Sequence, residues 1–180
     1  GFLTWGAVDY DSTRNIYIPS NSNIAAINTS ATAAPKGDQW SASIGVGANY
    51  PMGEMTITPT ARLGYLWVKN KAVTEYEPVN GLGLAVDART IESFQSALGA
   101  KLSGIMNTSS GVFGPYFSAQ WIHEFENDEP SIVSKYVNDP FNTTFVLPTA
   151  GPTRNYAILA IGSSATFPDN FSAFAQFSAA

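Results

Sequence analysis

The residues best suited to chemistry gather around the only histidine of the chain. His123 is followed by a run of carboxylates, Glu124, Glu126, Asp128 and Glu129. A histidine beside carboxylates could belong to a hydrolytic site, but there is no second histidine and no nucleophile motif. The sequence therefore assigns no catalytic residue. We interpret His123 as an amphipathic side chain at the edge of an apolar surface.

The carboxylate run has two interpretations. Its oxygen atoms are the ligands that Ca²⁺ prefers. Alternatively, the run is the solvated end of a strand, which is the interpretation we favour. The chain has no cysteine, so thiolate metal sites and a disulfide framework are excluded. The glycine pairs at 45–47 and 81–83 are not nucleotide loops, because no helical pattern follows either of them. We expect no metal and no cofactor.

The composition is unusual in its charge. Of the 180 residues, 44% are hydrophobic but only 13% are charged, and the net charge is −5 with a pI near 4.7. Soluble domains carry about 25% charged residues. The acidic balance argues against a nucleic-acid partner, which would need clustered lysine and arginine. No run of 18 apolar residues is present, so a transmembrane helix is not expected.

The main structural signal is strict alternation of apolar and polar residues, which places one kind of side chain on each face of a β-strand. Residues 39–50 show it without a break, with Trp40 and Ile44 on one face and Ser41 and Ser43 on the other. The same pattern predicts strands over 54–67, 93–106, 113–125, 157–167 and 171–179, and a weaker one over 1–9. The fold class is therefore all-β, with seven antiparallel strands.

Strand length and loop order separate two all-β architectures. Soluble domains use strands of about five or six residues, whereas these segments are roughly ten to sixteen residues long. The connections alternate between short turns (51–53, 107–110, 168–170) and long loops (11–37, 70–89, 127–153). Outer-membrane barrels have short turns on one side and long extracellular loops on the other. The sequence therefore predicts a single domain, residues 1–180, that is part of an up-and-down transmembrane β-barrel.

The placement of aromatic and charged residues agrees with a barrel. Aromatic residues on the apolar face form two predicted girdles, the outer one of Trp40, Trp67, Trp121 and Phe125 and the inner one of Tyr50, Phe113, Phe167 and Phe171. Five polar residues point to the lumen by parity: Arg62, Lys101, Tyr116, Gln120 and Glu124. They have three possible roles, which are contact with a segment passing through the pore, control of ion selectivity, or bracing of the lumen.

The long loops are predicted to lie outside the cell, and they differ in character. The segment 11–37 is rich in Asn, Ser, Thr and Ala, so we expect it to be mobile and the first to be cut by external protease. In the 127–153 loop, residues 132–137 are predicted to pair with 143–147, with Asn138, Asp139 and Pro140 in the turn. Cleavage at the short turns from outside would indicate inverted topology.

The chain does not begin or end as a closed barrel would. It begins in mid-pattern at Gly1, as a processed or excised chain would. Single-chain bacterial barrels have even strand numbers, and an open sheet edge in lipid leaves backbone groups unpaired. We therefore expect further strands or another chain to complete the barrel.

Several segments resemble the C-terminal β-domain of autotransporters, the translocators of type V secretion. The strongest is YFSAQWIHEFENDEPSIVSKYVNDPFNTTFVLPTAGP at 116–152, and 37–50, 61–70, 92–104 and 170–180 are also similar to family strands. The resemblance implies a barrel of about twelve strands, of which these look like the fifth to the eleventh. It also implies a bacterial outer-membrane location, a passenger or linker segment in the lumen, lipopolysaccharide around the barrel, and insertion by the barrel-assembly machinery.

Two other classes remain alternatives. A general porin or structural outer-membrane barrel would share the strands and the girdles, but its lumen would serve solutes. A soluble adhesive β-protein would share the alternation but has no reason to alternate short and long connections. A passenger domain upstream in the parent gene would support the translocator interpretation.

Overall fold

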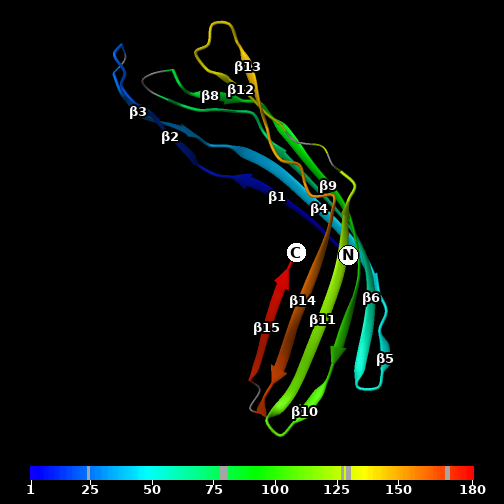
Figure 1. The fold of residues 1–180 in the computed structure, drawn as a ribbon. Helices are drawn as coiled ribbons and strands as arrows, with labels where there is room; N and C mark the ends of the chain where they lie inside the picture. Colours follow the sequence, from blue (N-terminus) through cyan, green and yellow to red (C-terminus); the bar gives the residue numbers. More distant parts are fainter. Residues whose placement is uncertain (24, 78–80, 127, 129–130, 169–170) are drawn as a thin grey trace.

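The computed structural model describes residues 1–180 except 24, 78–80, 127, 129–130 and 169–170. The main sheet is antiparallel, with strand order β1-β4-β6-β9-β11-β14-β15 and two short additions, β5 beside β6 and β10 beside β11. The path follows chain order throughout, so the sheet is an up-and-down meander (Figure 1). No helix in the described ranges is long and apolar enough to cross a membrane.

The strands of this sheet correspond to the seven predicted segments. Their bounds are β1 Phe2–Asp9, β4 Lys36–Gly47, β5 Tyr50–Met52, β6 Met55–Asn70, β9 Arg89–Gly104, β10 Met106–Thr108, β11 Gly111–Glu124, β14 Asn155–Thr166 and β15 Ser172–Ala179. β6 and β9 have 16 residues each, which is long enough for a tilted strand to cross a bilayer. The all-β, antiparallel prediction is confirmed.

The register keeps each predicted face together across the sheet. On one face, Ala61 lies opposite Leu98, and Ala119 lies opposite both Ala100 and Leu159. On the other face, Gly99 lies opposite both Thr60 and Gln120. A slip of one residue in any pair would mix the two faces. The alternation in the sequence therefore carries over into two continuous surfaces, one apolar and one polar.

The sheet is curled (Figure 1), and its two faces differ in exposure. The concave face is the polar one, and it also holds the most buried side chains of the sheet, including Ile122, Glu124 and Ala97. The apolar convex face is open, with Leu63 46% exposed and Ile161 60% exposed. A face of this kind is unfavourable in water and is suited to lipid. β1 and β15 form the two edges of the described sheet.

The short connections are tight turns. Gly53 and Glu54 join β5 to β6, and Gly53 has a φ of 66°. Glycine at the first central position of a two-residue hairpin loop has this conformation without a steric penalty. Ser109 and Ser110 form the second turn, between β10 and β11. In the third, Asp169 and Asn170 lie outside the described residues.

The long connections all carry strands. The 127–153 loop contains β12 (Ser131–Tyr136) paired with β13 (Thr144–Pro148), as predicted, with Ile132 opposite Leu147. In the turn, the Asp139 carboxylate accepts hydrogen bonds from the backbone N–H groups of Phe141 (2.9 Å) and Thr143 (2.6 Å). These two bonds lower the pKa of Asp139. The predicted hairpin and its turn chemistry are confirmed.

Residues 11–37 contain regular structure that the sequence analysis did not predict. This segment forms a hairpin of β2 (Ser12–Ile18) and β3 (Ile27–Ala33), and its expected early cleavage by external protease stays a prediction. The 70–89 connection also contains strands, β7 (Val73–Thr74) and β8 (Leu84–Val86), and the four-stranded order β13-β12-β8-β7 joins it to the third loop. β2 and β3 pair with each other, and the hairpin is anchored by contacts to the 70–89 loop. The composition of 11–37 does not reveal these contacts.

Candidate functional site

The concave face holds a recess near the middle of the sheet. Arg62 of β6 and Gln120 of β11 both line it, and its volume is about 340 Å³. Gly45 and Gly47 of β4 lie on one side and Ala97 of β9 on the other. The small side chains keep the recess open. Within the described part of the chain, the Arg62 guanidinium forms no ion pair.

Lys101 and Tyr116 form a second polar group on the same face. The Lys101 Nζ lies 4.6 Å from the centroid of the Tyr116 ring, a cation–π contact. The Tyr116 hydroxyl is hydrogen-bonded to Gln176 Oε1 at 2.5 Å, across Gly162. A Cβ on Gly162 would come within 2.7 Å of the Tyr116 ring and hydroxyl, so glycine is required for this arrangement. Gln176 was missed from the sequence, although it is polar and faces opposite to Phe177.

Glu124 is separate from these groups and has a different environment. It lies at the outer end of β11 and is only 1% exposed. Its carboxylate accepts hydrogen bonds from Ser93 Oγ (2.6 Å), Gln95 Nε2 (3.0 Å), the Phe94 backbone N–H (2.8 Å) and the Glu126 backbone N–H (3.2 Å). A carboxylate with this many donors is held in place, so its contribution is to join β9 to β11 at the rim.

The acidic run does not form a cation site in the described residues. Glu124 is occupied by its hydrogen bonds, Glu129 lies outside the described residues, and no group of three or more His, Cys, Asp or Glu in the described ranges could hold a metal ion. His123 lies opposite Ser96 on β9 and Asn155 on β14. Its Nδ1 is 2.8 Å from Asn155 Oδ1, and its ring contacts Phe125 and Trp121.

Aromatic side chains form a continuous row on the convex face toward the long loops. The ring centroids are 4.9 Å apart for Trp40–Tyr65, 6.4 Å for Tyr65–Phe94 and 5.0 Å for Phe94–Phe125. His123 and Trp121 continue the row beyond Phe125. Tyr65 and Phe94 were not assigned to the girdle from the sequence, although both have the correct parity. The structure also places Trp5 opposite Trp40, and Trp40 opposite Trp67.

The second aromatic group lies at the short-turn end. Phe113, Phe167 and Phe171 are in contact, with centroids 5.8 Å and 5.6 Å apart. Tyr50 lies opposite Ile57 on the same convex face and is 55% exposed. The two aromatic rows are separated along the strands by aliphatic residues, which is the arrangement of a barrel that crosses a bilayer.

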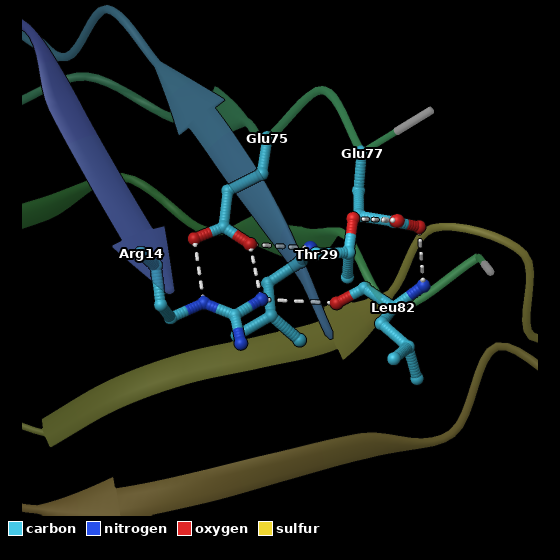
Figure 2. Close-up of polar contacts among 6 residues, drawn as sticks. Arg14, Thr29, Glu75, Glu77 and Leu82 are labelled. Carbon is cyan, nitrogen blue, oxygen red and sulfur yellow. Dashed lines mark hydrogen bonds and ion pairs between the residues drawn. The ribbon is translucent and has the colours of Figure 1, made fainter. Parts of the chain in front are cut away.

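The outer loops are joined by a half-buried polar junction that no sequence pattern indicated. Arg14 of the β2–β3 hairpin donates to both carboxylate oxygens of Glu75, at 3.0 and 2.6 Å, and to the Leu82 carbonyl at 2.9 Å (Figure 2). Thr29 donates to Glu77 at 2.8 Å, and Thr32 and Tyr76 exchange two backbone hydrogen bonds. The hairpin is thereby attached to the loop that follows β6.

This junction depends on ionised groups. The hydrogen bond from Arg14 lowers the pKa of Glu75, and the Leu84 backbone N–H adds to the effect. The same contact raises the pKa of Arg14. Both residues lie in the loops, outside the strands that cross the membrane. Glu75 has 13% of its side chain exposed and Arg14 has 38%, so solvent screens the pair only in part.

We expect acid to loosen this junction. Because the pKa of Glu75 is lowered by folding, its stabilisation is complete above the ordinary carboxyl pKa of 4.5 and is lost as the pH falls through the lowered value. With solvent screening taken into account, the junction should lose about 1 kcal/mol of stabilising free energy, which corresponds to a roughly fivefold faster local amide exchange. Hydrogen exchange at the Thr32 and Tyr76 amides measures it. In Glu75→Gln, these two amides should show the reduced protection at every pH. Amide protection that does not change with pH in the parent protein would contradict the prediction.

Comparison with known proteins agrees with this architecture. The family model described as the autotransporter beta-domain matches residues 1–178. No curated protein matches the chain. The match covers nearly the whole curled sheet and all of its loops. The chain therefore belongs to the autotransporter β-domain family, the outer-membrane β-barrels that act as translocator domains.

Proposed function

We propose that the concave face of this translocator forms the wall along which the passenger or its linker segment passes, and that the domain itself catalyses no reaction. The supporting observation is the recess beside Arg62, whose guanidinium has no ion pair within the described residues. Gln120 lies across the recess, and Lys101 and Tyr116 continue the polar surface toward the short turns. A passing chain has backbone and side-chain acceptors, which these donors can bind in succession.

The proposal assigns different roles to the five lumen residues. Arg62, Lys101, Tyr116 and Gln120 contact the passing segment. Glu124 braces the rim, because its oxygens are already occupied. His123 is an interfacial residue whose Nδ1 is hydrogen-bonded to Asn155 Oδ1.

We propose two further partners. We propose that lipopolysaccharide packs on the outer aromatic row, where Trp40, Tyr65 and Phe94 present ring faces at the loop end of the convex surface. The barrel-assembly machinery is proposed from family membership alone. Removal of the outer row by Trp40→Ala and Tyr65→Ala should weaken retention of lipopolysaccharide more than removal of Phe113 and Phe171 at the opposite end.

Site-specific photo-crosslinking tests the proposed path. In the full-length protein, p-benzoylphenylalanine in place of Arg62, Lys101 or Gln120 should crosslink to the passenger when secretion is arrested midway. The matched controls replace Leu63, Ala100 and Ala119, the adjacent residues on the convex face. These controls should give no passenger adduct, because a one-residue step reverses the side chain.

The opposite results are also informative. Passenger adducts from both sets would mean that the segment does not run along the concave face. No adduct from either set, together with steady ion conductance through the isolated barrel, would favour the porin class instead.

A further inference from the structure

A shallow apolar groove crosses the convex face near the short turns. Its floor is a row of small residues, in which Pro115 lies opposite Ser163, Ser163 lies opposite Ala175, and Gly104 extends the row onto β9. These residues come from β9, β11, β14 and β15, which lie side by side in the lower half of the sheet (Figure 1). The groove has a volume of about 850 Å³.

Bulky side chains form one wall of this groove. Leu102 lies opposite Phe117, Phe117 opposite Ile161, and Ile161 opposite Phe177, so the wall is aligned strand by strand. Met106 lies on the other side of the small-residue row, and Met55, opposite Gly104, ends the row on β6. Met106 follows Ile105, where β9 ends and β10 begins. The groove therefore arises from the strand register, because the pairing aligns small residues from four neighbouring strands in one row.

The surroundings of the groove identify what fills it. The convex face of this family faces lipid, and the groove walls are open, with Ile161 60% and Phe177 70% exposed. In a bilayer there is no water to cover such a surface, and association depends on close packing. An acyl chain is a flexible apolar cylinder that can pack between the wall and the methionines. A flat convex surface offers no such enclosure.

One charged group lies at the mouth of the groove. Glu54, in the turn between β5 and β6, lines it, and no lysine or arginine does. Within the described residues, the Glu54 carboxylate accepts no hydrogen bond. A carboxylate at the turn end of the barrel attracts a lipid headgroup that carries a donor cation. A headgroup whose only charge is a phosphate would meet repulsion instead.

We propose that this groove is a binding site for a phospholipid with a primary-ammonium headgroup, such as phosphatidylethanolamine. An acyl chain packs over the row from Gly104 to Ala175, and the ammonium donates to Glu54. The inference rests on the membrane location of the family and not on the proposed passenger path. Failure of either leaves the other unaffected.

Native mass spectrometry of the full-length protein tests the site. The protein is taken from nanodiscs that contain phosphatidylcholine with either phosphatidylethanolamine or phosphatidylglycerol. The parent protein should retain phosphatidylethanolamine in preference. Ser163→Leu fills the floor and should reduce retention of that lipid about tenfold, since packing drives association in the membrane. Glu54→Gln should reduce it about two- to fivefold, as expected for an exposed ion pair.

Matched variants control for general effects on the barrel. Ala119→Leu adds the same bulk on the convex face away from the groove, and Glu92→Gln removes a carboxylate at the opposite end of the strands. Neither should change retention. Equal retention of both lipids by the parent protein, or no loss with Ser163→Leu, would overturn the proposal. A dimer that Ser163→Leu abolishes would overturn it as well, because the groove would then be an interface between copies.

Discussion

Leu63→Arg is expected to destabilise the membrane-inserted barrel by about 2–4 kcal/mol, whereas Gly64→Arg should change its stability by no more than about 0.5 kcal/mol. The two residues are adjacent near the middle of β6, yet they face opposite environments. Leu63 is on the convex face, where an arginine must enter lipid. Gly64 is on the concave face, where a Cβ has no heavy atom within 4 Å and a long side chain can extend into the lumen.

The measurement is the free energy of unfolding in guanidinium with the full-length protein in phospholipid vesicles. Leu63→Ala serves as the control for loss of the leucine itself, because it removes the side chain without adding a charge. Equal destabilisation by both arginine variants would mean that the concave face is closed to a long side chain. A larger effect at Gly64 than at Leu63 would reverse the assignment of the two faces.

Glu124→Leu should cost about 2–3 kcal/mol. Leucine has a side chain of similar size, so it fills a site in which Glu124 is only 1% exposed. However, it removes the carboxylate that accepts four hydrogen bonds. Ser93, Gln95 and two backbone N–H groups then remain without a partner. A buried donor left unsatisfied costs the full penalty of its desolvation, which is larger than the net gain of an ordinary hydrogen bond.

Two further variants isolate the cause. Glu124→Gln retains one acceptor oxygen, so it should cost less than Glu124→Leu. Glu126→Leu, just beyond the end of β11, should be within about 0.5 kcal/mol of the parent protein. Hydrogen exchange at the Phe94 amide reports the local effect, and guanidinium unfolding reports the global one. If Glu124→Leu unfolds at the same denaturant concentration as the parent protein, the carboxylate does not join β9 to β11.

The sequence by itself determined the long strands of the main sheet, their two faces and their order. Alternation is a local property, since neighbours in a strand must point to opposite sides, and a twelve-residue run such as 39–50 leaves one arrangement of its faces. The β12–β13 hairpin was predictable for the same reason. Its two apolar arms flank Asp139, whose side chain organises the turn from within the segment.

Only the tertiary structure decided which loops contact each other and which polar side chains already have hydrogen-bond partners within the protein. Arg14 and Glu75 are 61 positions apart, and no local pattern relates them. Their contact requires that β4 pair with β6, because the loop that leads into β4 then lies beside the loop that leaves β6. Glu124 likewise has the same parity as Arg62, but only the placement of β9 beside it supplies the donors that bury it. Side-chain direction is encoded by adjacent residues, whereas burial and pairing depend on partners that the fold alone brings within reach.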